Sequence, residues 1–155
     1  MIQRIQSLYL LVIVILSGFT LLLPVVDFVN AAEGLHYLLG FKGIYLVQET
    51  GSIFESSTWA LSAIATLVPI ISFISIFLYK NRINQIRLSV INMFLMIGYY
   101  ILLLIFVWFA SVRLNADWSL RFVIAFPLIN LILNYLAMGA IGKDEKLVKS
   151  LNRIR

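Results

Sequence analysis

The sequence predicts an all-α membrane protein, a bundle of four transmembrane helices that forms one domain over residues 1–155. The first indication is composition, because 62% of the residues are hydrophobic and 12% are charged, whereas soluble domains have about 45–50% and about 25%. A water-soluble chain of 155 residues could not cover so much apolar side chain with polar surface. The second indication is four long apolar stretches, and the third is the distribution of basic residues between their flanks.

A helix needs about 20 apolar residues to cross roughly 30 Å of hydrocarbon. Four stretches meet this requirement, and none of them contains Asp, Glu, Lys, Arg or His. The predicted spans are residues 7–26, 59–79, 88–110 and 122–141. An alternative for the first stretch is a cleaved signal peptide, because the sequence at 30–32, Asn-Ala-Ala, resembles a cleavage site. We favour a span, since signal cores are only about 7–15 residues long.

Between the first two spans lies a long outer loop, residues 27–58. It contains two β-prone runs, Tyr37–Phe41 and Ile44–Gln48, separated by Lys42 and Gly43. Unstructured loops of this length are uncommon in compact domains. We therefore predict a β-hairpin here, with a segment resting in the outer membrane interface as the alternative.

The orientation follows from the basic residues that flank the spans. Nine lie on the side of the two termini and of the connection between the second and third spans. Three, Lys42, Arg113 and Arg121, lie on the other side. Because basic residues concentrate in cytoplasmic flanks, we expect both termini in the cytoplasm and the loop 27–58 outside.

Five neutral polar residues lie inside the predicted spans: Ser72, Ser75, Asn92, Asn130 and Asn134. Ser72, Ser75, Asn92 and Asn134 lie at similar depths in their spans. Each is about 6–10 Å from the cytoplasmic end of its helix, at a rise of 1.5 Å per residue. One interpretation is a polar cavity for a lipid headgroup or a substrate. The other, which we favour, is hydrogen bonding between helices, worth about 0.6 kcal/mol each on average.

Residues 142–155 form a basic tail with the pattern of an amphipathic helix. Such a helix binds anionic lipid at the cytoplasmic surface, at about 1 kcal/mol per basic residue, or docks on a partner protein. We do not expect nucleic-acid binding, because no aromatic residue accompanies these charges. Its apolar side consists of Leu147, Leu151 and Ile154, and its basic side of Lys146, Lys149 and Arg153.

The sequence contains no recognisable catalytic constellation. Proton relays and ion pathways use ionisable side chains within the membrane, and the predicted spans have none. There is no cysteine, and the single histidine, His36, has only Glu33 as a nearby acid, which is a weak metal-site pattern. We therefore expect no catalytic residue, no cofactor and no metal site.

Two stretches at the ends of the chain resemble a known family. They are the N-terminal run MIQRIQSLYLL, residues 1–11, and the tail with KDEKLV at 143–148 and SLNRIR at 150–155. With the four-helix layout, the chain resembles a bacterial family of small integral membrane proteins known as a domain of unknown function (number 4293). The resemblance implies the bacterial inner membrane and carries over no activity and no catalytic residues.

These observations favour a non-enzymatic accessory or structural subunit of an inner-membrane complex. Its expected partners are the lipid bilayer, with anionic lipid at the cytoplasmic face, and other membrane proteins. The alternative is a small transporter or lipid-binding protein that uses the five polar residues of the spans, and an integral membrane enzyme is the third possibility.

Overall fold

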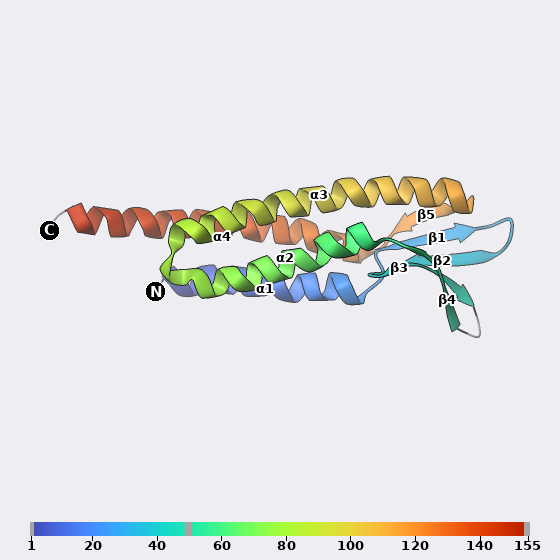
Figure 1. Ribbon diagram of the computed structural model, residues 1–155, viewed down its shortest axis with the longest axis horizontal. Helices are drawn as coiled ribbons and strands as arrows, with labels where there is room; N and C mark the ends of the chain where they lie inside the picture. Colours follow the sequence, from blue (N-terminus) through green and yellow to red (C-terminus); the bar gives the residue numbers. More distant parts are fainter. Residues whose placement is uncertain (1, 49–50, 154–155) are drawn as a thin grey trace.

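The computed structural model describes residues 2–48 and 51–153, with the backbone only at 2–4, 80 and 144–153. Four long helices lie side by side, and a five-stranded antiparallel sheet lies at one end of them (Figure 1). The first helix begins and the last helix ends at the opposite end. We call these two ends of the molecule the sheet end and the terminal end.

Each of the four helices in the described residues is long and apolar enough to cross a membrane. They follow one another around the bundle, with α1 against α2 and α4, and α3 against the same two helices. A 3-10 turn, η1, follows α2, and another, η2, precedes α4. The elements are α1 (Ile2–Leu22), α2 (Trp59–Phe77), η1 (Leu78–Lys80), α3 (Arg82–Leu114), η2 (Phe122–Ile124) and α4 (Ala125–Arg153).

The first helix ends four residues earlier than the sequence predicted, at Leu22. Pro24 causes the difference, because proline disfavours the helical conformation of the residue before it and has no N–H to continue the hydrogen bonding. Val26 then joins the sheet. The third helix is instead longer than predicted, with 33 residues and a length of about 50 Å, which exceeds the roughly 30 Å that a span has to cross.

The sheet has the strand order β4-β3-β2-β1-β5, and every pair is antiparallel. Four strands follow each other in the loop between α1 and α2, while β5 comes from the connection between α3 and α4 and pairs with β1. The strands are β1 (Val26–Asn30), β2 (Leu35–Leu39), β3 (Gly43–Gln48), β4 (Gly51–Ser57) and β5 (Asp117–Leu120).

The prediction of an all-α fold is therefore wrong, since the protein is a helical bundle with a sheet at one end. The predicted hairpin is present as β2 and β3, with the turn closed by a 2.9 Å hydrogen bond from Gly40 N to Gly43 O. In addition to the predicted hairpin, β1, β4 and β5 extend it into a five-stranded sheet. Strand β5 is only four residues long, and its partner β1 lies far away in the sequence.

Two side-chain contacts hold the sheet in place, one with α3 and one between the two connections that form the sheet. The Asn30 side chain donates to the carbonyl of Leu114 at the end of α3 (3.1 Å) and accepts from the backbone N of Ala32 (3.0 Å). Arg121, just after β5, donates from Nε to both carboxylate oxygens of Asp27 on β1, at 2.8 and 2.7 Å. The ion pair therefore joins the two connections that build the sheet.

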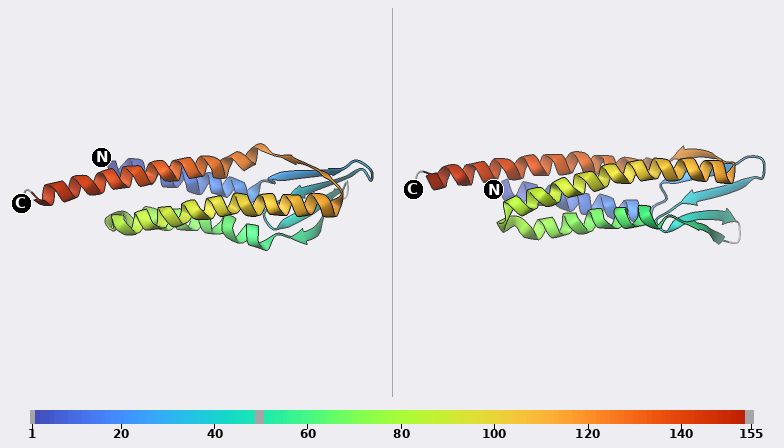
Figure 2. Two further views of the ribbon diagram at one scale, coloured as in Figure 1. Left: turned by 90° about the horizontal axis from the view of Figure 1, so that it is seen from above. Right: turned by 45° about the horizontal axis from the view of Figure 1, so that its top comes forward.

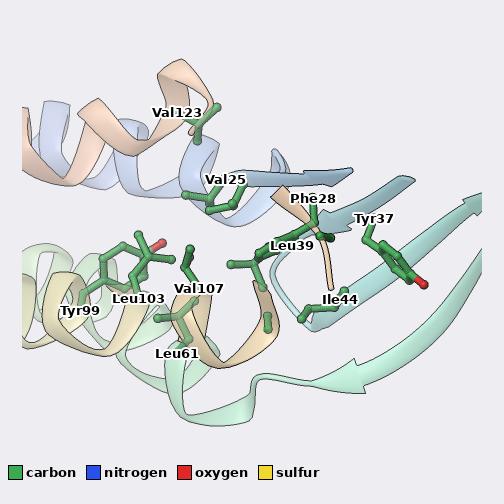
Figure 3. Packing of buried hydrophobic residues seen from close by; sticks show 13 residues of the cluster. Val25, Phe28, Tyr37, Leu39, Ile44, Leu61, Tyr99, Leu103, Val107 and Val123 are labelled. Atoms are coloured by element: carbon green, nitrogen blue, oxygen red, sulfur yellow. The ribbon is translucent and has the colours of Figure 1, made fainter. Parts of the chain in front are cut away.

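The apolar core has two parts. One lies in the middle of the bundle and contains Leu10, Ile13 and Met96. The other lies where the sheet meets α2 and α3, and Figure 3 shows Phe28 and Leu39 of the sheet near the side chains of these helices. Its labelled members are Val25, Phe28, Tyr37, Leu39, Ile44, Leu61, Tyr99, Leu103, Val107 and Val123. The sheet is thus a packed extension of the bundle.

Candidate functional site

The five polar residues singled out from the sequence all lie in the interior of the bundle. Each is at most 1% exposed, with Ser72 and Ser75 on α2, Asn92 on α3, and Asn130 and Asn134 on α4. The rest of each helix surface is largely apolar and exposed, as a lipid-facing surface is. The polar side chains can therefore bond only to the neighbouring helices, to each other or to enclosed solvent.

Two hydrogen bonds join α2 to α3. The Asn92 amide donates from Nδ2 to Ser72 Oγ at 2.8 Å. The Gln85 amide donates from Nε2 to the backbone carbonyl of Ser75 at 3.1 Å. Gln85 was outside the predicted third span, but α3 begins at Arg82, so its side chain is inside the bundle and 1% exposed.

The two asparagines of α4 bond to different helices. Asn134 donates from Nδ2 to the backbone carbonyl of Ser89 on α3 at 2.7 Å. Asn130 donates from Nδ2 to Ser17 Oγ on α1 at 3.0 Å. The five predicted residues therefore take part in separate contacts between neighbouring helices, α2–α3, α3–α4 and α1–α4.

The amide oxygens of this group have no hydrogen-bond partner among the described residues. They are Oε1 of Gln85 and Oδ1 of Asn92, Asn130 and Asn134. A buried carbonyl oxygen is destabilising unless a donor reaches it, and enclosed water is the usual donor. Asn130 lines a cavity of about 20 Å³ together with Ser17 and Thr20, which is enough for one water molecule at about 10–15 Å³.

The volume of this cavity is far smaller than the roughly 300–1,000 Å³ of ordinary small-molecule sites. The polar side chains around it, those of Ser17, Thr20, Tyr99 and Asn130, are uncharged and offer hydrogen bonds. The arrangement is suited to holding the helices in register. Sequence reasoning missed three members of this group: Ser17 in the first span, and two residues near the start of α3, Gln85 and Ser89.

The histidine of the outer loop is placed beside a different acid from the one considered in the sequence. His36 Nε2 lies 3.9 Å from Asp27 Oδ1, and Asp27 is already paired with Arg121. Within the described residues, no group of three or more His, Cys, Asp or Glu side chains could hold a metal ion.

The basic tail continues α4 as one helix as far as Arg153. Figure 2 shows it extending past the connection between α2 and α3, in line with the rest of α4. A helix lying flat on the membrane would need a bend, for which Gly142 is the natural position. Ile154 lies outside the described residues, as do the side chains of Lys146, Leu147, Lys149, Leu151 and Arg153.

The fold and the interior polar contacts define a class: a four-helix protein whose helices are long and apolar enough to span a membrane, with a small antiparallel sheet at one end. A family model described as Domain of unknown function (DUF4293) matches residues 2–154. The chain belongs to this family, and the resemblance noted at its two ends is confirmed. A comparison with curated proteins gave no match.

Proposed function

We propose that this protein is a non-enzymatic accessory subunit of an inner-membrane complex, with both termini in the cytoplasm and the sheet on the outer side. The distribution of basic residues along the sequence, nine in the flanks expected to be cytoplasmic and three in the flanks expected to be outside, supports the orientation. The bundle anchors the chain, and the sheet is the part that meets a partner.

The observation that carries the proposal is the contrast between the two halves of the molecule. In the bundle, each interior amide named above donates to a neighbouring helix, and the cavity beside Asn130 holds about 20 Å³. At the sheet end, β4 is an edge strand whose residues are mostly exposed, including Ile53 at 50% and Phe54 at 54%. An exposed edge strand that carries apolar side chains such as Ile53 and Phe54 is a surface for strand addition by another chain.

A photo-crosslinking residue at Ile53, in cells that express the protein at its native level, tests the partner surface. We expect one discrete protein adduct, and migration of the chain in an assembly larger than one copy on a native gel. The matched control is Ile132, which is 54% exposed on α4. A chain that migrates alone and gives no protein adduct from Ile53 contradicts the accessory role.

Cysteine labelling tests the orientation, since the chain has no native cysteine. An impermeant reagent added to intact spheroplasts should modify Asp117→Cys, which lies on the exposed strand β5. It should modify Asn84→Cys, exposed near the start of α3, only after lysis. Labelling of Asn84→Cys in intact spheroplasts reverses the orientation.

The second candidate is a small transporter or lipid-binding protein that uses the interior polar residues. The observation in its favour is the set of amide oxygens that have no hydrogen-bond partner among the described residues. Replacing Asn134 by Leu separates the two functions. Loss of a transport or lipid-binding activity with an intact fold would favour the transporter, whereas an accessory subunit keeps its assembly.

A further inference from the structure

A pocket of about 160 Å³ lies between the sheet and the last turns of α3. Its polar lining includes a basic residue, Arg113 of α3, and an acidic residue, Glu55 of β4. Hydroxyl side chains of Ser56 and Ser57 lie beside them, and Thr58, which is 1% exposed, has no partner for its Oγ1 in the described residues. The pocket thus presents opposite charges with hydroxyl groups next to them.

The backbone of the hairpin builds this side of the pocket in two ways. Tyr45 pairs with Phe54 and Ile44 with Ser56, so Glu55 is the extra residue of a β-bulge. Bulges re-aim side chains and are common next to functional sites. In addition, Gly43 lets β4 approach closely, because a Cβ at this position would be 2.1 Å from the Ser56 carbonyl oxygen. Both features place residues of β4 at the pocket.

The opposite side of the pocket is apolar and belongs to the membrane-spanning part of α3. Phe109 and Phe106 line it, about one and two turns before Arg113 on the same face of the helix. Phe109 is 70% exposed, so it faces the surroundings of the bundle. Trp108 and Trp59 are 73% and 75% exposed, and exposed tryptophans near helix ends mark the membrane–water interface.

The pocket therefore crosses the boundary between hydrocarbon and water. On its water side, Arg113 matches a phosphate, because a guanidinium donates in a fork that fits phosphate oxygens. Glu55 matches a primary ammonium group, to which a carboxylate accepts hydrogen bonds. On its hydrocarbon side, the two phenylalanines offer an apolar surface along which an acyl chain can lie.

We propose that this pocket binds the headgroup of an amine-bearing phospholipid, with the phosphate at Arg113, the ammonium at Glu55 and an acyl chain along Phe106 and Phe109. The volume of the pocket suits a headgroup. It is about ten times the 10–15 Å³ that one water molecule needs, and it is smaller than the roughly 300 Å³ of a site for a whole drug-sized molecule. In the described residues, Glu55 and Arg113 form no ion pair with each other. The bound lipid therefore connects α3 to the hairpin through these two side chains.

Native mass spectrometry of the full chain in a non-ionic detergent tests the site. Phosphatidylethanolamine, phosphatidylcholine and phosphatidylglycerol with identical acyl chains are titrated, together with soluble glycerophosphoethanolamine. We expect one tightly bound phosphatidylethanolamine per chain and weaker binding of the other lipids. Equal binding of the three lipids would overturn the proposal, and equally tight binding of the soluble compound would show that the ligand is not a lipid.

Single-charge variants identify the contacts. Arg113→Gln should weaken binding of phosphatidylethanolamine about tenfold, as expected for loss of a charge-assisted hydrogen bond. Glu55→Gln should remove the preference for phosphatidylethanolamine over phosphatidylcholine and keep the weaker binding of both. The matched controls, Arg87→Gln and Glu33→Gln, change exposed residues of the same types away from the pocket and should leave binding unchanged.

A third variant keeps the test decisive if the charge variants unfold. Ser57→Trp fills the pocket from an exposed position without removing either charge. Each variant is first compared with the native chain by thermal unfolding. A folded Ser57→Trp variant that still binds phosphatidylethanolamine as tightly as the native chain contradicts the assignment of the pocket.

Discussion

Gly43 is the residue at which a single added methyl group conflicts most directly with the structure. It begins β3 and pairs with Ser57 of β4. A Cβ at this position would lie 2.1 Å from the carbonyl oxygen of Ser56 and 2.8 Å from Cε2 of Phe54. The carbonyl oxygen belongs to the backbone, so it cannot turn away as a side chain does. The change Gly43→Ala must therefore move one strand relative to the other.

The size of the effect follows from these distances. Ordinary contacts begin at 3.4 Å, so the Ser56 carbonyl has to retreat by about 1.3 Å. Overpacking of this kind costs typically 1–3 kcal/mol. A destabilisation of about 2 kcal/mol raises the population of the open β3–β4 pair about 30-fold, because each 1.4 kcal/mol is a factor of ten.

Amide hydrogen exchange measures this opening locally, which matters because the helices can remain folded when the hairpin opens. We expect the amides of β3 and β4 to exchange about 30-fold faster in Gly43→Ala, with the exchange of α1 and α4 unchanged. The matched control is Gly40→Ala in the same hairpin. Its Cβ would first meet Tyr45 Cε2 at 3.5 Å, so a change within about 0.5 kcal/mol is expected.

Exchange in Gly43→Ala at the rate of the native chain would mean that β3 and β4 lie farther apart than described. An equal effect of Gly40→Ala and Gly43→Ala would also contradict the role of the close contact at Gly43. In that case the loss would reflect glycine's backbone freedom at either position and not the close approach of Ser56.

Three further predictions concern the bundle, the sheet and the tail. Asn134→Leu removes the hydrogen bond to Ser89 together with one amide oxygen that has no partner among the described residues. The free energy of unfolding measured in titrations should therefore change by about 1 kcal/mol or less; a larger decrease would mean that the asparagine has another partner. Arg121→Gln leaves the mostly buried Asp27 without the guanidinium that pairs with it. The β5 amides should then exchange faster, because the local free energy of opening falls by about 1 kcal/mol; unchanged exchange would show that the backbone pairing with β1 holds β5 by itself. A peptide of residues 142–155 should gain helix on anionic vesicles and lose it as salt screens its charges; indifference to these vesicles would favour a protein partner for the tail.

The number of spanning helices and the hairpin are properties of short stretches of sequence. A run of about 20 apolar residues is long enough to cross a bilayer whatever lies beside it, and each helix found in the structure contains most of one such run. Lys42 and Gly43 separate two β-prone runs in the sequence, and β2 and β3 form there, with the turn at residues 40–42. The burial of Asn92 and Asn134 also follows, because apolar spans leave their few polar residues to face other helices.

The ends of the spans were less predictable, because local signals compete there. Hydropathy extended the first span over Pro24, but the proline ended the helix at Leu22. At the third span, Arg82 and Arg87 marked a loop by their charge, yet α3 begins at Arg82 and includes both residues. A charged residue ends the apolar segment, and it does not have to end the helix.

Only the tertiary structure decided the sheet, the partners of the polar residues and the pocket at the sheet end. Strand β5 has four exposed residues, and it is a strand because β1 lies beside it once α3 and α4 are packed. Asn130 bonds to Ser17, and Arg113 shares a pocket with Glu55, across distances in sequence that no local pattern spans. Hydropathy and turn signals act over a few residues, whereas these contacts depend on how whole helices are placed side by side.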